Sequence, residues 1–398
     1  MEKKVCELFA GVGGFRLGLE RSSPDWNTVW FSQWEPNKSK QWAHQCYVSH
    51  WGDINEYTGI DISLVPKESI PNHNLLVGGF PCQDYSVARP LPGSNGLEGK
   101  KGVLWWQIRD VLIEKKSPFV LLENVDRLLK SPASQRGRDF GVMLACLADL
   151  GYSVEWRVIN AAEYGAGQRR RRIFIFAYQN NTNYAKRIMD EPINLITSSG
   201  FFATTFPVES NLDMNTVALD YGNLPELSAT FSFNFDSAGY MRDGVVYTSR
   251  VTPVYEEPMP LRNLLERDVA DKYYLRDRLD KWTYLKGPKK LKRTSKDGYE
   301  YVFSEGGIAF PDPIDLPART MLTSESSVNR STHVICDPQT KELRLITPIE
   351  AERIQGFEDN WTNTGMPEKF RYFTMGNALV VPMVTRMGRT LKQIFDNE

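Results

Sequence analysis

The stretch KVCELFAGVGGF at residues 4–15 decides the fold class of this chain. A short apolar run ends in a turn that contains Gly11, Gly13 and Gly14, and the residues after it have the pattern of a helix. Such a turn lets a ligand approach the backbone beside a helix N-terminus, which attracts anions. The dinucleotide pattern GxGxxG is not met, because Arg16 stands at its sixth position. Taken alone, the loop is compatible with a cofactor site and with a plain tight turn.

Further apolar runs have the length of strands and alternate with helical patterns. They cover residues 29–35, 75–80, 119–123 and 172–176. The clearest helical face lies at 140–150, and strands that alternate with helices predict an α/β fold with a mostly parallel sheet. From about residue 185 to 340, turn residues and aromatic clusters predict a second, irregular domain. Helical periodicity returns at 348–355 and 380–395.

The composition is that of a globular protein without a global charge excess. The 398 residues suggest two or three domains, and 41% hydrophobic residues argue against long disordered tracts. Lys plus Arg (48) and Asp plus Glu (49) leave a net charge of −1, so binding a polyanion would need a local basic patch. Five scattered cysteines without a CxxC pair predict neither a zinc site nor a disulfide framework. Because no run of about 18 apolar residues occurs, we expect no membrane span and a cytoplasmic protein.

Cys82 and Glu123 each stand where an apolar run ends. Open α/β sheets bind their ligands at the carboxyl ends of strands. A lone cysteine is commonly an inert packed thiol, but the glycines and proline at residues 78–81 predict a small exposed turn, which favours a nucleophile at Cys82. Glu123 closes the run 119–123, where a charged residue is either paired or functional.

Further candidate polar groups flank other strands. The run QRRRR at 168–172 enters a strand, and alternation would place Arg170 and Arg172 on one face. Its position beside an apolar segment favours recognition of an anion or a carbonyl over a solvated basic run. Glu35 and Asp53 each follow an apolar run, where a carboxylate either accepts hydrogen bonds from a ligand or lies solvated at a strand end.

Together these segments resemble the DNA cytosine-5 methyltransferases of bacterial restriction-modification systems. The resemblance spans nearly the whole chain, in the order of the family's motifs. It rests on FAGVGGF (9–15), GFPCQ (79–83), ENV (123–125), QRRRR (168–172), RLITP (344–348) with RIQGF (353–357), and GNA (376–378). Two departures are Glu7, where the family often has Asp, and Pro36, where a large apolar residue often follows the acid.

The resemblance implies a Rossmann-like α/β domain that binds S-adenosylmethionine as the methyl donor. This catalytic domain would comprise residues 1–185 and be completed by 365–398, with a smaller, irregular target-recognition domain at 186–364. Glu35 would bind the ribose hydroxyls and Asp53 the adenine amino group. The full implied cofactor set is Phe9, Gly11, Gly13, Gly14, Glu35, Asp53, Ile54, Pro81, Leu104, Asn377 and Leu379.

The resemblance also implies the chemistry of the site. The Cys82 thiolate would add to C6 of cytosine, because C5 is otherwise too weakly nucleophilic to take a methyl group. Glu123 would protonate or hydrogen-bond N3, while Arg172 binds the ring O2 and Arg170 supports the same region. The target base lies inside a duplex and must be flipped out, and Gln83 and Ser86 are candidates to hold the extruded nucleotide.

Duplex DNA is the implied partner, and the recognition domain would read its sequence. The segment from Lys281 to Lys296 contains no acid, so Lys289, Lys290 and Lys292 are candidate phosphate contacts, with a solvated surface segment as the alternative. Arg319 is a further candidate for positioning the DNA.

Two other function classes fit the same scaffold. A tRNA cytosine-5 methyltransferase of the Dnmt2 type would carry a Cys-Phe-Thr motif after the arginine run, but no cysteine occurs between Cys146 and Cys336. A non-catalytic DNA-binding relative would be expected to lack Cys82, Glu123 or the glycine turn, and all three are present. We therefore expect a DNA methyltransferase that acts as a monomer, with an independently acting restriction endonuclease as a candidate cellular partner.

Overall fold

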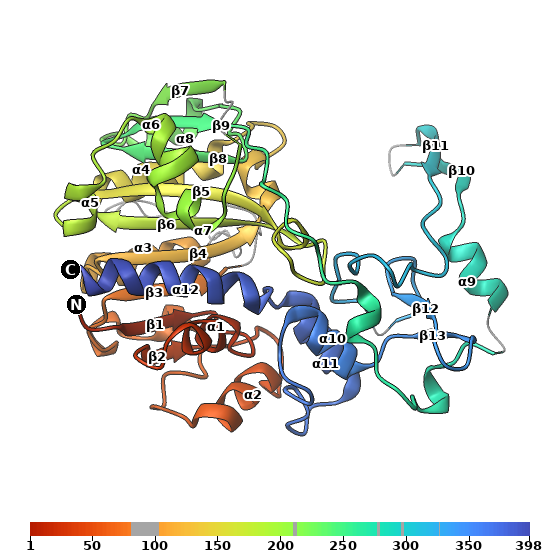
Figure 1. Cartoon of the computed structure of the whole chain (residues 1–398). Coiled ribbons are helices and arrows are strands. Elements are labelled where there is room, and N and C mark those ends of the chain that lie inside the picture. Colours follow the sequence, from red (N-terminus) through yellow and green to blue (C-terminus); the bar gives the residue numbers. More distant parts are fainter. Residues whose placement is uncertain (81–102, 210–212, 277–278, 296–297, 326) are drawn as a thin grey trace.

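The computed structural model describes residues 1–398 apart from 81–102, 210–212, 277–278, 296–297 and 326 (Figure 1). The described residues form one large sheet covered by helices, with a smaller, irregular half beside it (Figure 1). The nine strands of the large sheet are, in spatial order, β2 (Asn27–Ser32), β1 (Lys4–Leu8), β3 (Leu75–Gly79), β4 (Phe119–Val125), β6 (Arg171–Gln179), β5 (Tyr152–Asn160), β8 (Ala238–Arg242), β9 (Val245–Ser249) and β7 (Met214–Ala218).

The first part of this sheet is parallel and buried on both faces. β1 pairs in parallel with β2 and β3, and β3 pairs in parallel with β4. β6 is antiparallel to both β4 and β5, so β5 again runs in the direction of β1 to β4. In β4, Phe119 and Leu121 enter one core while Val120 and Leu122 enter the other, as expected for a central strand. The predicted α/β fold class is confirmed.

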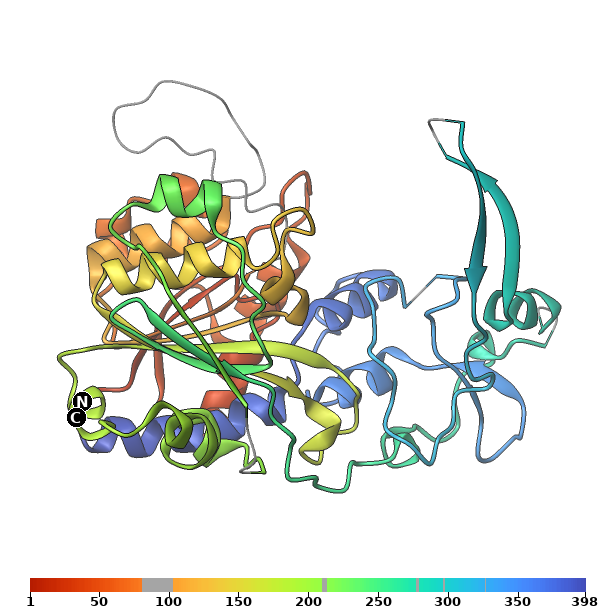
Figure 2. The same ribbon diagram turned by 90° about the horizontal axis from the view of Figure 1, so that it is seen from above.

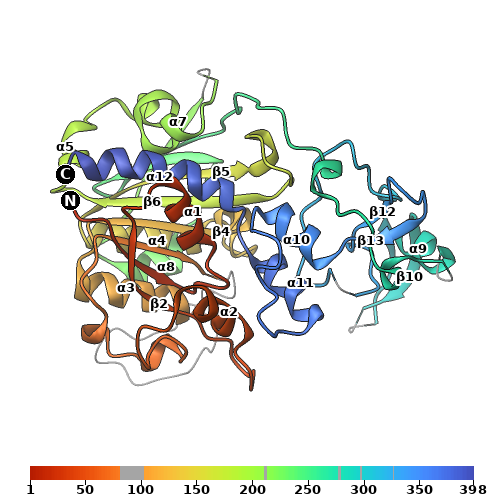
Figure 3. The same ribbon diagram turned by 60° about the horizontal axis from the view of Figure 1, so that its bottom comes forward.

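Helices cover both faces of the sheet. One face carries α1 (Gly14–Ser22), α5 (Asn183–Arg187), α7 (Phe201–Thr205) and α12 (Val381–Asp396), and the short α6 (Pro192–Asn194) lies between α5 and α7 in the chain. The other carries α3 (Val103–Lys115), α4 (Arg138–Asp149) and α8 (Leu224–Thr230), and α2 (Trp42–Trp51) lies near β2. The C-terminal α12 lies beside α1 (Figure 3). A Cβ at Gly18 would lie 2.6 Å from Val384 Cβ, so glycine permits this close approach.

The smaller half holds most of the irregular chain. It contains α9 (Leu279–Lys286), a hairpin of β10 (Lys289–Thr294) and β11 (Glu300–Glu305), and the short pair β12 (Val334–Cys336) and β13 (Leu343–Leu345). The helices α10 (Pro348–Gln355) and α11 (Glu368–Asn377) lie between this half and the sheet (Figure 1). The β10–β11 hairpin projects away from the rest of the molecule (Figure 2).

The large sheet extends further along the chain than the expected boundary at residue 185. β8 pairs with β5, with Trp156 opposite Gly239, and β9 and β7 continue the sheet from there. Residues up to Ser249 therefore contribute strands to the large sheet, and the division into a catalytic domain (1–185 with 365–398) and a recognition domain (186–364) stays a prediction. Among the described residues, no helix is long and apolar enough to cross a membrane.

Candidate active site

Glu123 lies at the carboxyl end of β4 and is 8% exposed. The pairing of β4 with β6 brings Arg172 beside it, with 2.8 Å between Arg172 Nε and Glu123 Oε1. Burial raises the pKa of Glu123, and the positive charges of Arg172 and Arg170 counter only part of this effect. The result is a desolvated carboxyl group that keeps its proton to higher pH than an exposed glutamate and is oriented by a guanidinium.

The end of β3 lies next to this pair. Gly79 is the register partner of Glu123, and a Cβ at Gly79 would lie 3.2 Å from Glu123 Oε2, so glycine leaves room for the carboxyl group. Asn124 Nδ2 donates to the carbonyl of Phe80 at 2.9 Å, which fixes the chain where it leaves β3. The predicted residues Pro81, Cys82, Gln83 and Ser86 follow directly and lie outside the described residues.

Arg170 has different partners from Arg172. Its guanidinium is buried and donates to the carbonyl of Met321 at 3.0 Å and to that of Gly376 at 2.9 Å. Burial lowers the pKa of Arg170 to about 9. Of the two arginines predicted to share a role, the structure therefore brings Arg172 to the carboxyl group and leaves Arg170 at the contact between the two halves of the molecule.

The other four cysteines are poor candidates for the nucleophile. Cys6, Cys46 and Cys146 are buried, and burial raises the pKa of each thiol, to about 12 for Cys46 and about 11 for Cys146. A buried thiol of raised pKa forms little of the reactive thiolate. Cys336 is half-buried and lies 3.5 Å from the carbonyl of Lys341 in the smaller half.

The glycine turn between β1 and α1 has a conformation that suits a ligand. Phe9, Gly11 and Gly13 have φ values of 55°, 58° and 86°, in the left-handed region that glycine adopts without strain. Gln33 Oε1 accepts from the Gly11 amide at 2.7 Å and holds the loop against the end of β2. No described atom lies within 4 Å of a Cβ built at Gly11, so open space adjoins the backbone there.

Glu35 follows β2 near this turn. The side chain of Gln41 binds the Glu35 backbone at both ends, accepting from its amide at 2.7 Å and donating to its carbonyl at 2.9 Å. The carboxyl group is half-buried, burial raises its pKa, and its buried Oε2 has no hydrogen-bond partner among the described residues. An unpaired buried oxygen of this kind is suited to accept hydrogen bonds from a ligand.

The remaining predicted cofactor residues come from several separate elements. Asp53 Oδ1 accepts from Thr58 Oγ1 at 2.5 Å and from the Ile54 amide at 2.8 Å, and Ile54 is 41% exposed. From the far end of the chain, Leu379 approaches the turn, since a Cβ at Gly14 would lie 3.1 Å from its side chain. Phe9 and Leu104 are partly buried and pack against the same core as α3. Asn377 is exposed at the end of α11.

The basic segment of the smaller half has two different faces. Directly opposite residues of a hairpin share a face, so Lys290 and Lys292 lie with Ser304 and Val302. Both lysines are exposed and neither faces an acid in the register.

On the opposite face of the hairpin, Lys289 and Arg293 contact other residues of the smaller half. Lys289 Nζ lies 3.3 Å from Glu305 Oε2 and donates to the carbonyl of Leu285 at 2.9 Å, while the Arg293 guanidinium stacks 3.9 Å above the Phe303 ring. The charge of Lys289 is therefore balanced by an acid, whereas Lys290 and Lys292 face no acid in the register.

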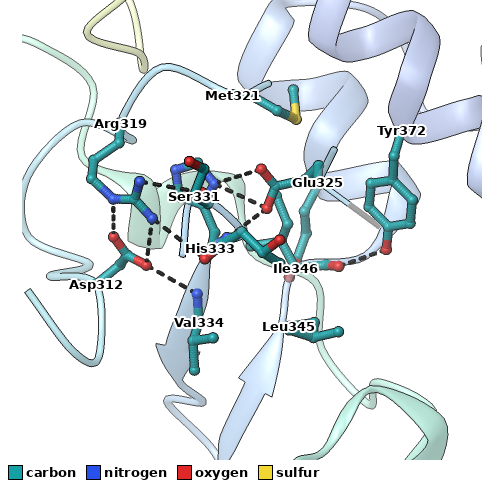
Figure 4. Close-up of polar contacts among 12 residues, drawn as sticks. Asp312, Arg319, Met321, Glu325, Ser331, His333, Val334, Leu345, Ile346 and Tyr372 are labelled. Atoms are coloured by element: carbon teal, nitrogen blue, oxygen red, sulfur yellow. Dashed lines mark hydrogen bonds and ion pairs between the residues drawn. The ribbon is translucent and has the colours of Figure 1, made fainter. Parts of the chain in front are cut away.

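Lys286 and Arg319 form ion pairs within the smaller half. Lys286, which lies within the basic segment 281–296, is 1% exposed, donates to the carbonyl of Thr332 and lies 3.8 Å from Asp312 Oδ2, so its ammonium group is engaged inside the protein. Burial lowers its pKa to about 8. Figure 4 shows Arg319 forming a fork with Asp312, at 2.5 and 3.1 Å. These bonds favour a supporting role for Arg319 over contact with DNA.

Sequence reasoning missed three glutamines that hold the site together. Gln33 and Gln41 fix the glycine turn and the Glu35 backbone, and buried Gln168 accepts from the Met321 amide at 3.0 Å. Gln168 could have been found, because it opens the arginine run; the other two carry no local signal. Among the described residues, no group of three or more His, Cys, Asp or Glu side chains could hold a metal ion.

Comparison with known sequences identifies the family. The family model for C-5 cytosine-specific DNA methylase matches residues 3–393. The chain is 51% identical to the type II methyltransferase M.Sau3AI of Staphylococcus aureus, over 98% of this chain and 96% of that protein. It is 32% identical to the type II methyltransferase M.HhaI of Haemophilus parahaemolyticus over 49% of this chain and 54% of that protein.

Solved structures support the fold. The methyltransferase EhMeth of Entamoeba histolytica aligns with a TM-score of 0.60 at 16% identity, over 100% of this chain and 99% of its own. The Dnmt2 methyltransferase of S. pombe aligns with a TM-score of 0.60 at 15% identity, over 99% and 98%. The family model and the near full-length relative show that the chain belongs to the C-5 cytosine-specific DNA methylases and is a DNA cytosine-5 methyltransferase.

Proposed function

We propose that the protein transfers a methyl group from S-adenosylmethionine to C5 of a flipped cytosine in a specific duplex sequence, through a covalent bond between Cys82 and C6. The observation that carries the proposal is the buried Glu123–Arg172 pair, 2.8 Å apart, next to the strand end that leads to Cys82. A thiol, a proton donor and a cation are the three groups this reaction needs around the ring.

Each group has a defined task. The Cys82 thiolate adds to C6, and the electron pair of the C5–C6 double bond moves into the ring. Glu123, whose pKa is raised by burial, donates a proton or hydrogen bond to N3 and stabilises the resulting charge, while Arg172 binds the ring O2. After the C5–CH3 bond has formed, loss of the C5 proton returns an electron pair that expels the thiolate from C6.

The residues beside the glycine turn have the chemistry to hold S-adenosylmethionine. Glu35 has a buried, unpaired Oε2 that would accept from the ribose hydroxyls, and Gly11 adjoins open space. Phe9 and Leu379 supply apolar surface, and Asp53 would face the adenine amino group. When bound, this group supplies an electrophilic methyl group on a sulfonium.

The exposed lysines of the hairpin are proposed to bind the duplex. Lys290 and Lys292 offer point charges on a projecting arm, a chemistry that suits phosphates more than base edges (Figure 2). Lys289 has an acid partner and contributes less. The 51% identity to a type II methyltransferase supports a role in host protection, with a restriction endonuclease acting independently on the same sites.

Labelled methyl transfer tests the substrate. The full chain is incubated with S-adenosylmethionine carrying a tritiated methyl group and either duplex DNA or tRNA, and bisulfite sequencing then locates the product. We expect 5-methylcytosine at one short DNA sequence and none in tRNA. Methylation of tRNA in preference to duplex DNA would contradict the proposal and favour the Dnmt2-type alternative.

A further inference from the structure

A short segment of the chain forms hydrogen bonds with both halves of the molecule. This latch segment, residues 318–321, pairs with the arginine run that precedes β6: the Arg169 amide donates to the Ala318 carbonyl and the Ala318 amide to the Gly167 carbonyl, both at 2.8 Å. Thr320 Oγ1 donates to the Arg169 carbonyl at 2.6 Å. The latch segment thus lies against the chain that leads directly into Arg172.

Two buried side chains bind the backbone of Met321 at both ends. Gln168 Oε1 accepts from its amide at 3.0 Å, and Arg170 donates to its carbonyl at 3.0 Å. The second arm of the Arg170 guanidinium donates to Gly376 at the end of α11, at 2.9 Å. Glycine is required there, because a Cβ at Gly376 would lie 2.4 Å from the backbone of Leu322.

The smaller half holds the same segment from the other side. Arg319 forms its fork with Asp312, and Asp312 also accepts from the Val334 amide of β12 at 2.9 Å (Figure 4). The positions of β12 and of the latch segment are therefore linked. Two residues beyond Arg170, the chain carries Arg172, which orients Glu123.

We propose that Arg170 is a positioning residue that couples the seating of the recognition half to the Arg172–Glu123 pair. This inference rests on the proposed function. The planar fork of Arg170 joins carbonyls from two separate segments, and a lysine, with its single ammonium group, cannot reproduce that geometry. Loss of the latch would misplace the groups that act on the cytosine ring, and small misplacements of reacting groups are costly in rate. The glycine turn and Glu35, which are held by Gln33 and Gln41, would stay in place.

The test compares Arg170→Lys with Arg171→Lys under single-turnover conditions. Arg171 is adjacent and exposed, and its side chain forms a surface ion pair with Asp126 at 3.2 Å and no other hydrogen bond or ion pair within the described part of the chain, so its variant is the matched control. At saturating S-adenosylmethionine and duplex DNA we expect the rate of methyl transfer to fall about tenfold to a hundredfold for Arg170→Lys and to stay unchanged for Arg171→Lys. The Kd values for S-adenosylhomocysteine and duplex DNA should stay within about twofold of wild type.

A second, milder variant keeps the test valid if Arg170→Lys does not fold. Thr320→Val removes the hydrogen bond to Arg169 with little change of shape and should slow the same step by about twofold to tenfold. A wild-type rate for Arg170→Lys, or a loss that disappears at saturating DNA, would overturn the inference. Failure of the proposed function would differ from failure of this inference, because wild type and Arg171→Lys would then also fail to methylate duplex DNA.

Discussion

The two faces of the β10–β11 hairpin predict unequal roles for neighbouring lysines. Lys290 and Lys292 are exposed on a face without an opposing acid, whereas Lys289 is bound to Glu305 and to the Leu285 carbonyl. Each phosphate contact contributes about 0.9 to the slope of log K against log salt concentration. The double variant Lys290→Ala/Lys292→Ala should therefore reduce this slope by about 1.8, and Lys289→Ala should leave it nearly unchanged.

Filter binding across a salt series, with a cognate and a random duplex of equal length, measures both slopes. Because phosphate contacts carry no sequence information, the double variant should weaken binding to the two duplexes by the same factor. An unchanged slope would assign Lys290 and Lys292 to a solvated face. An equal effect of Lys289→Ala would refute the distinction between the faces, and a loss confined to the cognate duplex would place the hairpin among the base-reading elements.

Three further predictions concern the body of the protein. Glu123→Gln should slow single-turnover methyl transfer by roughly 10²-fold. The wild-type rate should fall as pH rises through the raised pKa of Glu123, because the protonated carboxyl group is the active form, and the variant should lose this fall; rapid-quench measurements over a pH series test both effects. Glu35→Ala should weaken S-adenosylhomocysteine binding in calorimetry by about tenfold, while unchanged affinity would remove Glu35 from the pocket. Gly376→Ala should cost about 1–3 kcal/mol of stability in chemical denaturation, because its Cβ would collide with Leu322; wild-type stability would contradict the packing described here.

The sequence contains strong signals for the part of the fold that forms the candidate site. The glycine turn at residues 11–14 and Glu123 in β4 stand where apolar runs end, and the structure places both toward the carboxyl ends of parallel strands. Burial on both faces makes such runs nearly continuous and easy to recognise. The return of α12 to the first domain was predicted through the family resemblance, and Gly18 and Gly388 are the small residues that permit it.

The antiparallel extension of the sheet was missed because its strands are short and its edge strand is largely exposed. β7, β8 and β9 have five residues each, and β7 is largely exposed. One usable signal was present: Asp243-Gly244 forms the two-residue turn of the β8–β9 hairpin with φ values of 50° and 75°, the pattern preferred in such turns. Recognising it would have predicted the β8–β9 hairpin.

The partners of individual charges could not be predicted from local sequence. Lys286 lies in a run without acids, yet its partner Asp312 comes from a distant loop that only the folded smaller half brings near. Arg319 binds the same aspartate, and Arg170 bonds to carbonyls more than 150 residues away. Such contacts depend on tertiary packing, so the sequence indicated that these cations were significant without indicating what they bind.

A covalent trap with a fluorinated cytosine identifies the residue that attacks C6. Once bisulfite sequencing has located the target cytosine, a duplex with 5-fluorocytosine at that position is incubated with the protein and S-adenosylmethionine, and the adduct is mapped by peptide mass spectrometry. Because fluorine at C5 leaves no proton to be lost, the account predicts a stable bond between the DNA and Cys82, absent in Cys82→Ser. An adduct on Cys336 or on any buried cysteine, or methylation without an adduct, would contradict it.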